Sequence, residues 1–242
     1  MKSEKKQTKK VKSIKEKVIL DEQEIPADIK NQVESQLQPL FSNFYASSEQ
    51  YVLYKKYEDY YEYKFRKADD FFGVTYELNN FYLLEGLSKS KVDPIDQKRH
   101  LNFNYAFNYL MLVETIGTLY INQVILLLIG SGHTFHLEPD INHRYIRHAK
   151  SLEDIESPVI SLASKLDFLA EHGLSFFSKW IDRQLRNRIA HLDFDIDEKG
   201  DFFIIKNKKK KINLLKKIKE FEMYSKLLDN IFYEEIYKRR KK

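Results

Sequence analysis

The chain has 242 residues, 43% of them hydrophobic, which is enough to bury the core of one sizeable domain. It contains only 7 glycines and 5 prolines, which disfavours an all-β fold and favours long helices. Cysteine is absent, which excludes disulfides and thiolate zinc sites and fits a cytoplasmic protein.

The net charge of +5 hides an uneven distribution of basic residues. Residues 1–17, 206–219 and 238–242 together hold 21 of the 41 basic residues and 2 of the 36 acidic ones. The rest of the chain keeps 20 basic and 34 acidic residues, a net charge of −14. Lysine runs attract polyanions without sequence specificity. They are equally typical of solvated tails that aid solubility.

The chain opens with a basic segment that no long apolar run follows, so we expect no signal peptide there. Residues 1–17 are predicted to form a disordered basic tail. Residues 18–242 are predicted to form a single helical domain that ends in a basic helix, at about 212–237, and a basic tail.

From Pro26 onward apolar residues recur at helical intervals, and residues 51–87 are dense in tyrosine and phenylalanine. Within this segment Tyr60, Lys64 and Lys67 follow at helical spacing. Aromatic residues interleaved with lysines can stack nucleic-acid bases. More often such rings pack in a core or a dimer seam, with their hydroxyls at its wet edge.

Residues 88–97 form the clearest linker, and Asp93 before Pro94 is typical of a helix start. The helix that follows is predicted to span about 95–129 and contains the most apolar run of the chain, residues 116–130. A membrane-spanning helix needs roughly 20 apolar residues. We therefore expect a buried central helix and no membrane insertion.

A polar loop is predicted over residues 130–148. Its histidines could ligate zinc, but their spacing fits no closed zinc site, so no metal is expected; they are His133, His136, His143 and His148. The loop could instead contact RNA. A helix is then predicted over 157–172, with Ser157 as its cap.

The stretch from 174 to 192 carries the candidate chemistry. Apolar residues recur there at intervals of four, which predicts one amphipathic helix; they are Phe177, Ile181, Leu185 and Ile189. Its polar side carries RNRIAH at 186–191. Asn187 and His191 are neighbours on one flank, whereas Arg186 and His191 lie roughly 140° apart on an ideal helix. These two meet only if the helix ends or bends near Ala190, or if two chains combine.

These residue types suit phosphodiester chemistry. Imidazole exchanges protons near neutral pH, and a guanidinium grips phosphate oxygens with two parallel hydrogen bonds. The alternative is a capping and solvation feature at a helix end. Glu114, an acid in the predicted central helix, either faces Arg186 or His191 across the bundle or lies on an exposed flank.

The motif R-N-x-x-A-H at a helix end resembles the Arg-x4-6-His signature of the HEPN superfamily (higher eukaryotes and prokaryotes nucleotide-binding). Arg186 matches the arginine, Asn187 the polar residue after it, and His191 the histidine. The resemblance covers this hexapeptide within a helical context. It implies a bundle of four or five helices, homodimerisation and metal-independent endoribonuclease activity. Many members are toxins or phage-defence effectors, and some only bind nucleotide or nucleic acid.

We therefore predict an all-α, HEPN-like bundle of long helices, with a small β-hairpin near 193–205 that turns at Gly200. In the expected endoribonuclease His191 transfers a proton and Arg186 holds the scissile phosphate. Asn187 positions His191 or the phosphate, and no metal or cofactor takes part. Further contacts to RNA are expected from Arg183 and Arg188. The expected partners are RNA, a second copy that completes the active site, and an antitoxin or another protein. The alternative is a non-catalytic module that binds RNA, nucleotide or protein.

Overall fold

The structure, a computed structural model, describes residues 25–46, 52, 55–68, 70, 93–135, 148–158, 160–204 and 210–238. The predicted tail at 1–17, residues 88–92 of the linker, and the loop histidines His136 and His143 lie outside these ranges.

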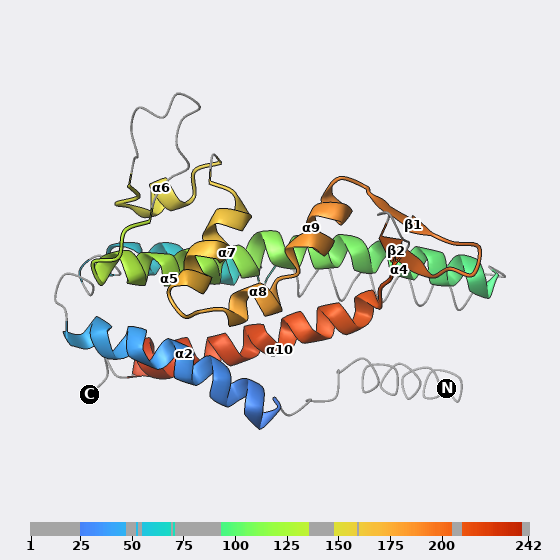
Figure 1. Ribbon diagram of the computed structural model, residues 1–242. Helices are drawn as coiled ribbons and strands as arrows, with labels where there is room; N and C mark the ends of the chain where they lie inside the picture. The colour runs from blue at the N-terminus through green and yellow to red at the C-terminus, as the bar shows by residue number, and fades with distance from the viewer. Residues whose placement is uncertain are drawn as a thin grey trace, which may run out of the picture.

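One long helix forms the centre of the molecule (Figure 1). It consists of α4 (Pro94–Leu112), the π-helical turn η1 (Val113–Gly117) and α5 (Thr118–Gly130). The Asp93 side chain caps its start by accepting a hydrogen bond from Ile95 N at 2.7 Å, which confirms the predicted helix start. The predicted extent of this helix is also confirmed.

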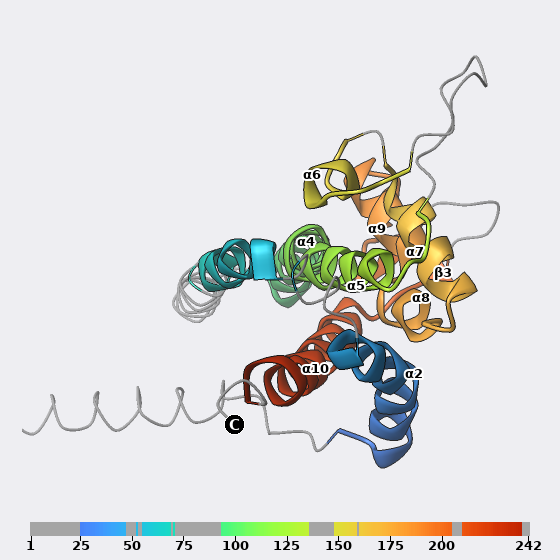
Figure 2. The ribbon, with the colours of Figure 1, turned by 90° about the vertical axis from the view of Figure 1, so that its left-hand side faces the viewer.

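The other helices surround this centre on three sides (Figure 2). One side holds α10 and α2, another the helical residues 55–68, and the third the helices α6 to α9. Their bounds are Ala27–Ala46 for α2, Leu152–Ile155 for α6, Leu162–Glu171 for α7, Phe176–Trp180 for α8, Arg183–Ala190 for α9 and Leu214–Phe232 for α10. The turn η2 (Tyr233–Lys238) continues α10. The described part of the chain is thus mostly helical, as predicted.

An aromatic cluster joins these layers. The ring of Tyr120 on α5 lies 4.7 Å from that of Phe65, 6.1 Å from that of Trp180 and 5.5 Å from that of Phe232, measured between centroids. Tyr61 is also completely buried. Part of the tyrosine-rich segment therefore packs in the core, as the alternative interpretation had it.

The segment Pro94–Gly130 is long and apolar enough to cross a membrane by length and composition. Inside the structure 72% of its most apolar window is buried. Core helices of soluble proteins pass the same test. This burial supports the interpretation of the segment as the central core helix.

The predicted helix over 157–172 begins too early. Ser157 accepts a hydrogen bond from Ile160 N at 3.0 Å, which closes a turn, and α7 starts only after Ser161. The Ser161 hydroxyl accepts a hydrogen bond from the backbone three residues on, at 3.1 Å, so it is the cap. Gly173, with φ of +82°, ends the segment as predicted.

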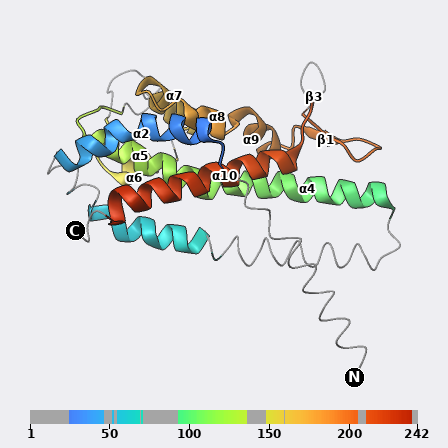
Figure 3. The same cartoon turned by 90° about the horizontal axis from the view of Figure 1, so that it is seen from below.

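The predicted β-hairpin is confirmed, and a third strand extends it. The sheet has the antiparallel order β1 (Phe194–Ile196), β2 (Phe202–Ile204) and β3 (Lys210–Lys211), and Ile196 pairs with Phe202. The turn is fastened to α4, since Asn102 Nδ2 donates to Gly200 O at 2.7 Å. The sheet consequently lies beside α4 (Figure 3).

Candidate active site

The stretch from 174 to 192 was predicted to form one helix, but it forms two. Helix α8 ends at Trp180 and α9 begins at Arg183. Asp182 separates them, because its Oδ1 accepts a hydrogen bond from Leu185 N at 3.0 Å and so caps the second helix. The predicted apolar stripe is nevertheless buried, because both short helices turn it toward α4 and α10.

Two contacts hold the start of α9 against the central helix. The backbone N–H of Asp182 donates to the hydroxyl of Tyr109 on α4 at 3.1 Å. Burial raises the pKa of Tyr109, so this hydroxyl stays neutral. Gly117 in η1 permits a close approach, since a Cβ there would lie 3.0 Å from Cδ1 of Ile181. The motif helix therefore begins directly beside the π-helical turn.

This approach lets Arg186 reach Glu114, the second residue of η1. Arg186 Nε and Nη2 both contact Glu114 Oε1, and Arg186 Nη1 donates to Asn187 Oδ1 at 2.8 Å. The two paired side chains are 25% and 39% exposed, so the pair adds about 1 kcal/mol or less to stability. Its main effect is to fix the direction of the guanidinium. Glu114 thus faces Arg186, as one of the two alternatives had it, and is also exposed, as the other had it.

His191 stands at the end of the motif helix. Helix α9 ends at Ala190, as one of the sequence alternatives required, and His191 is its C-cap residue, with its N–H donating to Asn187 O at 3.0 Å. The side chain is exposed, and with the described residues it forms neither a hydrogen bond nor an ion pair. The imidazole is thus open to a ligand, but within the described contacts of one chain it does not touch Arg186.

The two further arginines of the motif helix, Arg183 and Arg188, differ in how closely they pair with acidic residues. Arg183 lies 3.7 Å from Asp167 and stays 43% exposed, so it can contact a ligand. Arg188 Nη1 donates to Asp193 Oδ2 at 2.8 Å. This bond ties the end of α9 to the residue before β1, which gives Arg188 a structural role. Binding of RNA by either residue stays a prediction.

The turn after His191 is a Schellman motif. Asp193 N donates to Arg188 O at 2.7 Å and Leu192 N to Ile189 O at 3.1 Å. Leu192 occupies the position of this motif that is usually glycine, and its φ is +57°. The leucine side chain is also 72% exposed. Leu192 thus combines a strained backbone with an exposed side chain, directly beside the candidate histidine.

Replacing Leu192 with glycine should raise the free energy of unfolding by about 1 kcal/mol, because glycine adopts this backbone conformation without strain. The expected rise in Tm is about 2–4 °C. Leu192→Ala is the control, since it removes the exposed side chain but keeps the Cβ that causes the strain. Equal stability of the two variants in thermal unfolding would contradict this account.

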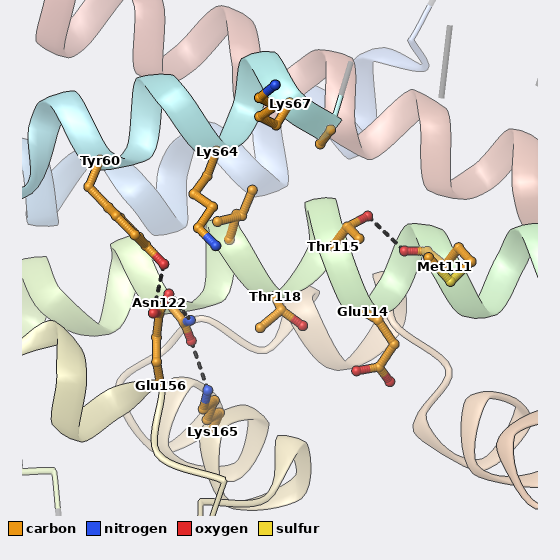
Figure 4. A pocket seen from close by; sticks show the side chains of 12 residues that line it. Tyr60, Lys64, Lys67, Met111, Glu114, Thr115, Thr118, Asn122, Glu156 and Lys165 are labelled. Carbon is orange, nitrogen blue, oxygen red and sulfur yellow. Dashed lines mark hydrogen bonds between the residues drawn. The ribbon is translucent and has the colours of Figure 1, made fainter. Parts of the chain in front are cut away.

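A groove of about 510 Å³ begins at Glu114 and runs between the helical residues 55–68, the central helix and α7 (Figure 4). Its walls carry the buried Lys165 and Asn122, neither of which was among the predicted site residues. A signal was present for one of them, since Asn122 interrupts the most apolar run of the chain.

The histidines at the edges of the predicted loop do not form a metal site with the described residues. His133 packs edge to face against His172, with 4.5 Å between ring centroids, and burial lowers the pKa of His133. Among the residues that the structure describes, no group of three or more histidine, aspartate or glutamate side chains is arranged to hold a metal ion.

Comparison with known proteins gives no match to this chain, whether with family models, curated proteins or solved structures.

Proposed function

We propose that the protein is a metal-independent endoribonuclease of the HEPN type, active as a toxin or a phage-defence effector. One observation carries the proposal. His191, with an exposed imidazole, is the C-cap residue of α9. Arg186 lies on the same helix and is oriented by Asn187 and by Glu114 of η1. A proton-transfer group and a phosphate-binding group are therefore displayed within one short helix.

The proposed reaction is attack of the ribose 2′-oxygen on the adjacent phosphorus. The new O2′–P bond forms as the P–O5′ bond breaks, leaving a 2′,3′-cyclic phosphate and a 5′-hydroxyl. His191 removes the 2′-hydroxyl proton or supplies the proton to the 5′-oxygen. Arg186 binds the phosphate oxygens, on which negative charge builds up in the transition state.

The test is incubation of the purified protein with single-stranded RNA in excess EDTA. The expected products carry cyclic phosphate ends, and a substrate with a 2′-deoxy residue at the cleaved position should stay intact. Loss of cleavage in EDTA, or equal cleavage of the deoxy substrate, would contradict the mechanism.

The proposed active site is shared between two copies of the chain. Within one chain Arg186 turns toward Glu114, and no described contact joins it to His191. A two-fold axis near the end of α9 would place the arginine of one subunit beside the histidine of its partner, since such an interface brings the same surface of both chains together.

An exposed apolar patch next to the motif supports this pairing. It consists of Phe103 and Phe107, about one turn apart on α4, which are 58% and 51% exposed. The Phe103 ring lies 6.3 Å from that of Phe194 in β1, and Leu192, which is 72% exposed, precedes Phe194 by two residues, so the patch lies beside the segment that follows the motif helix. Apolar side chains gathered at one place on a surface are typical of interaction sites.

Phe107→Glu should shift the protein from dimer to monomer and lower RNA cleavage in parallel, because it places two carboxylates in the proposed interface. Sedimentation equilibrium and cleavage rates measure the two effects. Val52→Glu is the control, since Val52 is 66% exposed and not part of the patch. A fully active Phe107→Glu monomer would contradict the shared site, and a fully active Phe107→Glu dimer would contradict the placement of the interface at this patch.

A second candidate function is binding of RNA, nucleotide or protein without catalysis. The observation that favours it is the same ion pair, since Glu114 already occupies one edge of the Arg186 guanidinium. Such a module would retard RNA in a salt-sensitive manner and leave it uncleaved.

A further inference from the structure

The groove described above and the candidate active site share one wall. Glu114 lines the groove and also binds Arg186. Arg186 and the groove therefore lie on either side of the Glu114 side chain. The volume of about 510 Å³ is within the range of sites that hold small molecules, which runs from about 300 to 1,000 Å³.

Two lysines face this groove from different elements. Lys64 projects from the helical residues 55–68 toward the central helix (Figure 4). Its ammonium lies 5.3 Å from the centroid of the Tyr60 ring and forms no salt bridge within the described part of the chain. Lys165 enters from α7 and is only 5% exposed. Its Nζ donates to Asn122 Oδ1 at 2.9 Å and likewise has no salt bridge among the described residues.

The burial of Lys165 is costly for the fold. Desolvation lowers its pKa to about 8, even though the carboxylates of Glu156 and Glu114 act in the opposite direction. An ammonium held in this state has two donor positions left after its bond to Asn122. An anion that enters the groove would satisfy them.

The acidic groups of the groove are already engaged. Glu156 Oε2 accepts a hydrogen bond from the Tyr60 hydroxyl at 2.7 Å, and Glu114 is paired with Arg186. Lys64, Lys165 and Arg186 face these two carboxylates, which leaves a positive excess for an anionic ligand, whereas the ammonium of Lys67 points away from the groove toward the Tyr63 ring (Figure 4).

The groove also offers acceptors for a sugar. The hydroxyl of Thr115 donates to Met111 O at 2.7 Å and that of Thr118 to Val113 O at 3.0 Å. Both hydroxyl protons are therefore used within the helix, and both oxygens keep lone pairs directed away from these bonds. Ribose hydroxyl groups are suitable donors to them.

We propose that this groove binds the phosphate and ribose of the RNA nucleotide next to the cleaved bond. The inference rests on the proposed function, since it takes RNA as the ligand. Lys64 and Lys165 hold the phosphate, Thr115 and Thr118 accept hydrogen bonds from the ribose, and the helix that carries Tyr60 and Lys64 forms the outer wall.

The test is the affinity for a fluorescent single-stranded RNA, measured in EDTA and in a His191→Ala background so that the RNA stays intact. Lys64→Gln should weaken binding about tenfold at low ionic strength, as expected for loss of one charged hydrogen bond. It should also reduce the slope of log affinity against log salt by about 0.7, because one phosphate contact is lost. Lys64 is exposed, so the variant is expected to fold.

The matched control is Lys55→Gln. Lys55 precedes Lys64 by nine residues, which is about half a turn around the same helix, and it is 56% exposed. This variant should keep the affinity and the salt slope of the parent. Lys165→Met should weaken binding as Lys64→Gln does, provided its circular dichroism matches that of the parent.

The outcomes separate this inference from the proposed function. Cleavage by the wild type with equal affinity of Lys64→Gln and Lys55→Gln would overturn the groove and leave the nuclease. Weakened binding by Lys64→Gln, together with no cleavage by the wild type, would support the groove and remove the nuclease. Absence of RNA binding by the parent would overturn the groove.

Discussion

His191→Ala should lower the rate of RNA cleavage by about 10²–10⁴-fold, the usual contribution of a positioned acid or base. The imidazole is exposed and bonds no described residue, so its loss should leave folding and RNA affinity nearly unchanged. A fall in kcat with an unchanged KM is therefore expected in single-turnover and steady-state assays in EDTA.

The control for this experiment is His100→Ala. His100 is an exposed histidine on α4, and about 20 Å of helix separates it from Glu114. It should cleave RNA like the wild type. Full activity of His191→Ala would remove the imidazole from the mechanism, and with it the proposed nuclease.

The parts of the fold that depend on local signals could be predicted from the sequence. Asp93 and Pro94 mark the start of the central helix, and Gly200 marks the turn of the hairpin. Each signal lies within a few residues of the feature that it specifies, because capping and turn formation are local interactions.

The parts that depend on contacts between distant segments were missed or misplaced. The apolar stripe of 174–192 is continuous in sequence, yet Asp182 interrupts the helix because its backbone and side chain find partners on α4 and in α9. The cap of α7 was predicted at Ser157 but lies four residues later, at Ser161, in a helix that packs against α5.

The candidate site divides in the same way. His191 and Arg186 could be selected because their residue types and spacing are a local pattern. The pairing of Glu114 with Arg186 could only be stated as one of two alternatives. The two residues are 72 positions apart, and no local sequence signal determines which faces of two helices pack together. The groove lysines come from two further segments and could not be assigned to one site.

Arg186→Ala should lower cleavage by about 10²–10³-fold, because it removes a positioned donor to the phosphate on which charge develops. Arg186→Lys should recover only part of this loss, since an ammonium keeps the charge but cannot bind two oxygens in a fixed plane. The measurement is kcat and KM for a defined RNA in EDTA, with Arg183→Ala, which lies on the same helix, as the comparison.

Glu114 acts in this scheme only through the guanidinium that it orients, and a double-mutant cycle tests that dependence. Glu114→Ala alone should lower kcat about tenfold, because Arg186 becomes free to rotate, while RNA affinity should rise slightly since a negative charge is lost. In the Arg186→Ala background the same change should have no further effect on kcat. If the two losses instead multiply, Glu114 contributes to the reaction independently of Arg186, and the ion pair is not the device that positions the phosphate-binding group.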